Sequence, residues 1–205
     1  MADDKLKSYR SKRSTQRSPE PGTHESRRAP HADAPIFVIQ KHDASTLHYD
    51  FRLEIDGVLK SWAVPKGPST DPREKRLAVE TEDHPLDYAD FEGVIPEGEY
   101  GGGTVEVWDI GTFANLKVDD AGHVEKTLAQ AFEDGHLTVW LEGKKLTGGY
   151  SFTHFRTERG KRQWLLVKMD DEAADARRNP VSTQPESALS GRTIEQIARD
   201  AESDD

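Results

Sequence analysis

The most constraining feature of this chain is the strict alternation in LHYDFRLEI, residues 47–55. Apolar side chains occupy the odd-numbered positions and polar side chains the even-numbered ones. Successive side chains of a β-strand point to opposite faces, so this period of two predicts a strand with one buried face. The Asp56-Gly57 pair that follows favours a tight hairpin turn. What the polar face of the strand does is then the question that decides function.

Short segments with strand character, separated by turn residues, recur along the chain. They lie at 36–40, 46–55, 58–64, 76–82, 104–111, 136–143, 146–155 and 163–169. One helix is expected at 123–135, where apolar residues recur at helical spacing: Val124, Leu128, Ala131 and Phe132. This pattern predicts a mainly β fold, a small antiparallel β-barrel with one or two flanking helices.

The N-terminal end of the chain is basic. Residues 1–28 hold eight Lys and Arg against four Asp and Glu, and Ser and Pro recur among them. A segment of this composition has too few apolar side chains to bury a core of its own. We therefore expect residues 1–34 to form a basic mobile arm, followed by a barrel domain over residues 35–169.

The C-terminal end is acidic. Residues 169–205 hold ten Asp and Glu against four Lys and Arg, so a linker-like tail is expected over 170–205. Thr193 and Gln196 have the spacing of a capping box, which predicts a short helix at 193–202. The whole chain has a formal net charge of −10. That charge neither requires nor excludes a nucleic-acid substrate, because a local cationic patch would be enough to bind phosphate.

The residue types present limit the chemistry. The 205 residues include no cysteine, so a metal ion would need nitrogen and oxygen ligands. No apolar run reaches the length of a signal-peptide core or a membrane span, so we expect a cytoplasmic protein with no membrane partner. The glycine-rich PEGEYGGG, residues 96–103, leads into a strand and lacks the Gly-Lys-Ser/Thr ending of a nucleotide-binding loop. Turn or bulge glycines explain it better.

Three polar residues on the alternating strand form a candidate metal site. His48 and Asp50 share one strand face because they are two residues apart, so both can reach one cation. His42, just before the strand, can supply a third ligand. Two imidazoles and a carboxylate suit Mn, Fe, Co or Zn and leave positions open for water or substrate. The alternative is a solvated strand face with an ordinary His–Asp hydrogen bond.

A second polar cluster lies in TEDHPLDYADFEG, residues 81–93. It places Glu82, His84 and Tyr88 where a strand runs into a loop, and loops at strand ends often carry site residues. The alternative is an acidic turn in which Tyr88 is a core aromatic residue.

A third set is cationic: Arg52, Lys66 and Arg76. Arg52 shares the strand face of the candidate ligands, and a guanidinium beside a metal ion is well suited to grip a phosphate. Lys66 and Arg76 are candidates for the same role. As single residues, both could equally be surface charges.

FVIQKHDASTLHYDFRLEIDGVLKSWAVPKGPS and LAVETEDHPLDYADFEGVIPEGEYGGGTVEVWD resemble the 3′-phosphoesterase domain of the bacterial DNA ligase D family. The resemblance extends over about residues 5–169, and HDASTLHYDFRLE and EDHPLDYADFEG are highly specific motifs. It implies a small β-barrel and an enzyme of DNA double-strand break repair by non-homologous end joining. The implied activity is manganese-dependent removal of a 3′-phosphate and trimming of a 3′-terminal ribonucleotide, with Co²⁺ or Zn²⁺ as other possible ions.

The resemblance also implies roles for single residues. The metal ligands would be His42, His48 and Asp50. Phosphate would be held by Arg52 and His84, with support from Tyr88. Ribonucleotide trimming would involve Arg13, Glu20 and Glu82. Ser14 departs from the family pattern, which usually has aspartate there, so we expect trimming to be weaker than phosphate removal.

The resemblance implies partners as well. The substrate would be the 3′ end of a DNA or RNA/DNA primer–template, met at the nucleoid during repair. SGRTIEQIARDAE resembles the linker after this domain in the full enzyme, so we expect a free-standing domain and a monomer. Ku and a separate ATP-dependent ligase are candidate partners.

Two other hypotheses remain open on the residues alone. In a non-haem iron oxygenase, His48, Asp50 and a later histidine such as His84 would form the metal triad. That reading leaves the cationic set and His42 without a role. In a catalytically silent module, the chain would recruit repair partners through its tails.

Overall fold

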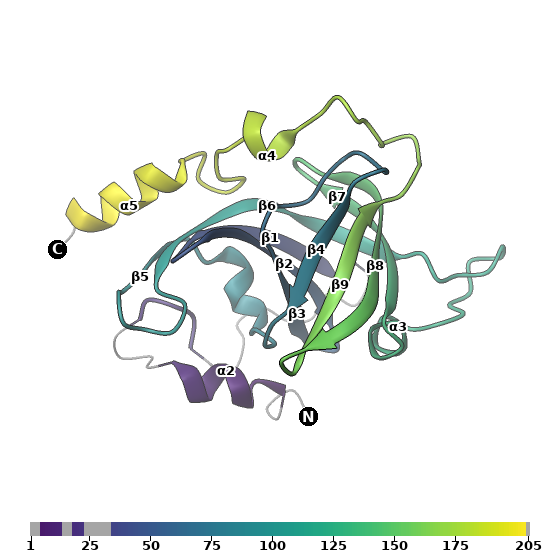
Figure 1. Cartoon of the computed structure of the whole chain (residues 1–205), viewed down its shortest axis with the longest axis horizontal. Coiled ribbons are helices and arrows are strands. Elements are labelled where there is room, and N and C mark those ends of the chain that lie inside the picture. The colour runs from purple at the N-terminus through teal and green to yellow at the C-terminus, as the bar shows by residue number, and fades with distance from the viewer. Residues whose placement is uncertain (1–4, 14–17, 23–33, 204–205) are drawn as a thin grey trace.

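The computed structural model describes residues 5–13, 18–22 and 34–203 (Figure 1). The strands are β1 (Ile36–Asp43), β2 (Leu47–Ile55), β3 (Val58–Val64), β4 (Lys75–Glu80), β5 (Gly93–Ile95), β6 (Gly103–Asn115), β7 (His136–Gly143), β8 (Thr147–Glu158) and β9 (Lys161–Lys168). The helices are α2 (Lys7–Lys12), the 3₁₀-helix η1 (Leu86–Asp90), α3 (Leu128–Glu133), α4 (Pro180–Thr183) and α5 (Ile194–Ser203). Among the described residues, no helix combines the length and the apolar character needed to cross a membrane.

The strands form a closed antiparallel barrel, as predicted. Hydrogen bonding follows the order β1-β2-β3-β4-β9-β8-β7-β6, and β1 also pairs with β6, which closes the ring. The short strand β5 pairs with β6 beside this ring. Because the ring is closed, none of its strands has an unpaired edge that could pair with another chain.

The turn after β2 has the geometry that its sequence predicts. Asp56 and Gly57 both have positive φ, 53° and 78°. Two positive φ values in a two-residue loop define a type I′ turn, whose twist matches that of the paired strands. The turn fixes the register of β2 on β3, in which Arg52 lies opposite Ser61.

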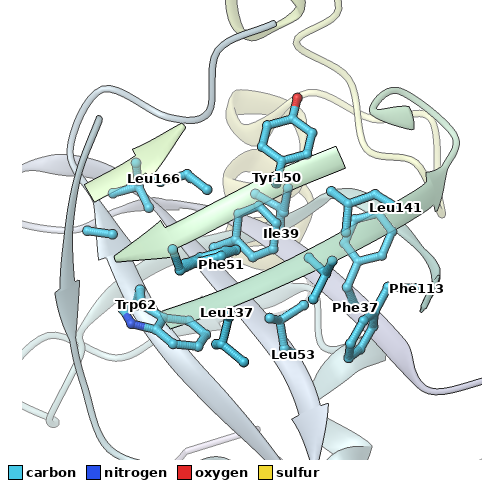
Figure 2. Close-up of a cluster of buried hydrophobic side chains, with 14 of the residues drawn as sticks. Phe37, Ile39, Phe51, Leu53, Trp62, Phe113, Leu137, Leu141, Tyr150 and Leu166 are labelled. Carbon is cyan, nitrogen blue, oxygen red and sulfur yellow. The ribbon is translucent and has the colours of Figure 1, made fainter. Parts of the chain in front are cut away.

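Each face of β2 packs in a different core. The odd-numbered side chains, such as Phe51 and Leu53, point into the barrel and join its aromatic interior with Trp62 and Phe37 (Figure 2). The even-numbered side chains point outward and are still buried from Asp50 to Glu54. A second apolar cluster surrounds them; it includes Val38, Leu59, Leu86, Tyr88 and Val107. The polar face of β2 from Asp50 to Glu54 is therefore covered by this second cluster and is not exposed to solvent.

The helix expected at 123–135 is shorter than predicted. α3 begins at Leu128 because the Thr127 side chain caps the backbone of Gln130, and Gln130 caps Thr127 in return. Val124 lies outside the helix, is 59% exposed and bridges to Val118. The helical spacing of Val124 was misleading, because this residue lies before Thr127, the N-cap residue of the helix.

The N-terminal segment also differs from the expected mobile arm over 1–34, in the part that the structure describes. α2 lies against the outer face of the barrel, with Leu6 and Tyr9 buried. The Tyr9 ring makes edge-on contacts with the rings of His84 and Tyr88, at centroid distances of 5.2 and 6.0 Å. One aromatic side chain therefore anchors a segment whose basic composition suggested mobility.

The C-terminal segment, for which a linker-like tail was expected over 170–205, is hydrogen-bonded to the barrel. The Trp108 indole donates to the Gln184 carbonyl at 2.8 Å, and the Ala188 amide donates to the Val107 carbonyl at 2.8 Å. The predicted helix is present as α5, which packs against β5 and β6.

Replacing Ile197 by alanine should weaken the attachment of α5, because this side chain is 2% exposed in the contact with the barrel. We expect a loss of about 2 kcal/mol or more in the free energy of unfolding and a fall of roughly 4–8 °C in Tm. Thermal unfolding and hydrogen exchange of the α5 amides measure this. Glu202→Ala, an exposed position on the same helix, is the matched control. Equal stability of the two variants would contradict the packing of α5.

Candidate metal and anion site

Two adjacent strands bring the candidate ligands together. His42 on β1 lies directly opposite His48 on β2 in the antiparallel register, and their ring centroids are 4.9 Å apart. Asp50 follows His48 by two residues and so points to the same face. One ligand atom from each of the three residues lies within 4.8 Å of the others.

Backbone carbonyls orient both imidazoles. The Nε2 atom of His42 lies 2.9 Å from the Gly101 carbonyl, and the Nδ1 atom of His48 lies 2.9 Å from the Thr46 carbonyl. A carbonyl oxygen only accepts, so these two nitrogens carry the protons. The other nitrogens, His42 Nδ1 and His48 Nε2, lie 3.6 and 3.5 Å from the Asp50 carboxylate oxygens.

This donor set fits a divalent transition-metal ion. Two unprotonated imidazole nitrogens and a carboxylate oxygen converge on one point, and each imidazole donates its other N–H to a carbonyl. Such an outer hydrogen bond is the usual support for a metal-binding histidine. His42, His48 and Asp50 would hold the ion.

Arg52 lies beside the ligand carboxylate and is itself buried. Its guanidinium donates to Gln40 Oε1 at 2.7 Å, to Ser61 Oγ at 2.9 Å and to Asp50 Oδ2 at 3.1 Å. Burial raises the pKa of Asp50, but the charge of the neighbouring Arg52 opposes this effect, and the pKa lies well below its usual range. Asp50 is therefore ionised, as a metal ligand must be.

His84 is buried between two arginines. Its Nδ1 lies 2.9 Å from the Glu82 carbonyl and 3.0 Å from Arg52 Nη1, and its Nε2 lies 3.3 Å from Arg13 Nη2. Burial lowers the pKa of His84, and the charges of Arg52 and Arg13 lower it further, well below the ordinary value. The ring is therefore neutral at physiological pH, with a guanidinium facing each of its nitrogens.

The N-terminal segment supplies the remaining polar groups. Arg13 donates to Glu20 Oε1 at 2.9 Å and to Glu82 Oε1 at 2.8 Å. The Tyr88 hydroxyl donates to the same Glu20 oxygen at 2.9 Å. Arg13, Glu20, Glu82 and Tyr88 thus form one network, which contacts His84 through Arg13 and the Tyr88 ring.

These groups line a single cavity of about 200 Å³. Its walls include the three candidate metal ligands, Arg52, His84, Tyr88, Arg13, Glu20 and Glu82. Eleven site residues were candidates from the sequence, and these nine come together here. Ser14 lies outside the described residues.

The other two candidates, Lys66 and Arg76, lie apart from this cavity. Lys66 is exposed after the end of β3. Arg76 on β4 pairs with Glu74 at 2.8 Å and lines a different cavity beside Ser69. This geometry does not support their expected role as phosphate ligands, because their positive charge alone did not indicate which part of the barrel each would occupy.

Three residues that hold the site together were not predicted. Gln40 is fully buried and accepts from Arg52 while it donates to the Tyr88 and Phe91 carbonyls. Ser61 is the cross-strand neighbour of Arg52, and Gly101 orients His42. Gln40 shares a strand face with His42 two residues away, and this spacing was the only available signal in the sequence.

Two imidazoles, one buried and one half-buried, and a carboxylate lie beside two arginines, an arrangement that could hold a metal ion next to an anion. A family model described as the DNA ligase D 3′-phosphoesterase domain matches residues 40–154, more than half of the chain. The chain belongs to this family, and the resemblance noted in the sequence is confirmed.

Several characterised relatives are similar over most of this chain. The multifunctional non-homologous end joining protein LigD of Pseudomonas aeruginosa is 48% identical over 194 residues, 92% of this chain and 22% of that protein. The LigD proteins of Mycobacterium tuberculosis and Mycolicibacterium smegmatis are 41% and 43% identical, each over 82% of this chain and 20% and 21% of their own lengths. The chain thus spans about a fifth of the length of these relatives.

Replacing Arg13 by alanine should raise the pKa of His84, because a positive charge next to the ring disfavours its protonated form. Nitrogen-15 NMR of the imidazole, followed as the pH is lowered, measures this. Lys66→Ala removes a cation outside the cavity and should leave the titration of His84 unchanged. An equal response to both variants would mean that Arg13 does not face the ring.

Proposed function

We propose that this chain is a manganese-dependent 3′-phosphoesterase that processes DNA ends during double-strand break repair by non-homologous end joining. The observation that carries the proposal is the cavity in which the three-ligand group lies beside the buried Arg52 and His84. Membership of the ligase D 3′-phosphoesterase family supports both the reaction and the pathway. The names of the relatives also include non-homologous end joining.

The phosphate would occupy the cavity between the ligand group and the two arginines. A bound Mn²⁺ would supply Lewis-acid stabilisation of the phosphoryl oxygens. Arg52 is held in place by Gln40 and Ser61 and would stabilise the charge that develops on those oxygens. Arg13 faces the same cavity and would neutralise the opposite side of the phosphate.

His84 is placed to handle the proton that the leaving 3′-oxygen needs. Its Nδ1 is enclosed by the Glu82 carbonyl and Arg52, so Nε2 is the atom that we assign to take up and release a proton. A phosphate dianion next to the ring favours the protonated imidazole and offsets the effect of the two arginines. We assign His84 as general acid in the substrate complex. The ring of Tyr88 packs against the His84 ring, with the two centroids 4.7 Å apart.

Trimming of a 3′-terminal ribonucleotide would use the network from the N-terminal segment. Arg13, Glu20 and Glu82 place a guanidinium and two carboxylates at one wall of the cavity, where a ribose 2′-hydroxyl would need a donor and an acceptor. Phosphate removal depends less on this wall, because it requires the ion and Arg52.

The oxygenase hypothesis has less support. The ligand group consists of His42, His48 and Asp50, and His84 lies instead between Arg52 and Arg13. Two arginines at the cavity favour a phosphate ester over dioxygen chemistry. The third hypothesis, a silent recruitment module, predicts no turnover and is tested by the assay below. Ku and a separate ATP-dependent ligase remain the partners that we propose.

The phosphatase reaction can be assayed on a primer–template ending in a 3′-phosphate, with manganese or with a chelator. We expect turnover only with the ion. Arg52→Ala should reduce kcat/KM by about 100-fold or more, because one fixed donor to the transition state is lost. Calorimetry should show that this variant still binds Mn²⁺, since guanidinium is not a ligand.

Arg76→Ala is the matched control for that variant, because Arg76 lies outside the cavity. It should keep full activity. Comparable losses in the two variants would contradict the assignment of the phosphate site to this cavity. Absence of turnover in the wild type with manganese would favour the silent module.

Replacing Ser14 by aspartate tests the departure from the family pattern. Serine can hydrogen-bond but lacks the negative charge and the basicity of the usual aspartate. We expect the wild type to trim a 3′-ribonucleotide weakly and the variant to trim it faster, with phosphate removal unchanged. Rates on matched ribonucleotide and 3′-phosphate ends measure both. Equal rates of the two reactions in the wild type, with no effect of the substitution, would make Ser14 a neutral replacement.

A further inference from the structure

Tyr100 is an exposed aromatic side chain at the mouth of the cavity. It is 46% exposed, and it lies in the loop between β5 and β6, where it lines the same cavity as the metal ligands and Arg52. Its neighbour Gly101 holds His42 through the backbone carbonyl. Tyr100 is therefore attached to the site but has no role in the steps assigned above.

The surroundings of the ring are cationic. Lys12 Nζ lies 4.7 Å and Arg13 Cζ 5.2 Å from the ring centroid. The hydroxyl donates to Glu82 Oε2 at 3.4 Å. An exposed aromatic ring among cations is the arrangement with which proteins bind unpaired nucleotides, because the bases stack on the ring and the cations attract the backbone.

The glycine-rich segment around Tyr100 fixes its position. Gly103 has a φ of 139°, and a Cβ on it would approach the Asp43 carbonyl oxygen to 2.2 Å. A Cβ on Gly102 would approach the Pro96 carbonyl oxygen to 2.9 Å. The loop therefore packs closely against the end of β1 and against itself, so that the ring is presented at the cavity mouth by a constrained backbone.

We propose that Tyr100 contacts the substrate and stacks on the base of its 3′-terminal nucleotide. This rests on the proposed function, in which the terminal phosphate lies beside Arg52 and the ligand group. The base is separated from that phosphate by one sugar, and the exposed mouth of the cavity is the direction in which the nucleoside must extend. Every base has an aromatic face that can stack, so this contact would require a terminal base but would not discriminate among the four bases.

The test compares ends that carry a terminal base with ends that lack it. Two duplexes ending in a 3′-phosphate would be used, one with 2-aminopurine and one with an abasic residue as the terminal nucleotide. Tyr100→Ala should weaken binding of the first about 5- to 100-fold and leave the second unchanged. The fluorescence of 2-aminopurine should be quenched on binding to the wild type and less so on binding to the variant.

Three further variants separate stacking from other effects. Tyr100→Phe keeps the ring without the hydroxyl and should bind like the wild type, whereas Tyr100→Leu keeps the bulk without the aromatic face and should behave like Tyr100→Ala. Phe155→Ala removes a ring that is 45% exposed outside the cavity, and it should have no effect. Manganese calorimetry checks that each variant retains the ion.

Each outcome decides one proposal. Equal weakening of Tyr100→Ala on base-carrying and abasic ends would overturn stacking, as would a Leu variant that binds like the wild type. If the wild-type protein still removes the 3′-phosphate when either of these results is found, the proposed function is retained and only the stacking contact is rejected. Wild-type protein that neither binds nor processes either duplex with manganese would overturn the proposed function, and the stacking contact with it.

Discussion

The buried guanidinium of Arg52 is the interaction on which the rest of the site depends. A buried charge is tolerated only when it is paired and hydrogen-bonded, and the partners of Arg52 come from three adjacent strands: Gln40 on β1, Asp50 on β2 and Ser61 on β3. The same contacts that satisfy this charge therefore fix the spacing of the strands at the metal ligands. They also explain why the outward face of β2 needs a cover of its own, because these hydrogen bonds weaken when water competes for them.

That cover comes from segments far apart in the chain. η1 brings Tyr88 over the Arg52 guanidinium at 5.0 Å, and α2 brings Tyr9 against both His84 and Tyr88. Arg13 follows α2 directly, so that the packing of Tyr9 determines where Arg13 enters the cavity. The apolar anchor and the cation beside it make the N-terminal segment a wall of the site. The barrel supplies the candidate metal ligands, and the segments outside it supply the remaining walls of the cavity.

Some of this could be predicted from the sequence and some could not. The alternation of β2 predicted the strand and the shared face of His48 and Asp50, because a period of two leaves little choice of geometry. The Asp56-Gly57 pair predicted its turn. The packing of α2 was missed because the basic composition around it outweighs a single tyrosine. That Lys66 and Arg76 lie outside the cavity of the other candidates could not be predicted, since residue spacing gives the face of a strand but not its place around a closed barrel.

Charge balance links the ion to the anion. The described lining of the cavity contains two arginines, Arg13 and Arg52, and three carboxylates, those of Glu20, Asp50 and Glu82. Lys12 lies outside this lining but is ion-paired with Glu82, so the cations of the site match its carboxylates. A divalent ion on Asp50 and the two imidazoles would add positive charge. The ion and a phosphate would therefore favour each other's binding, and by linkage each would raise the affinity for the other by the same factor. Since neither arginine loses its proton, the cationic half of this balance persists at every pH at which the protein is folded.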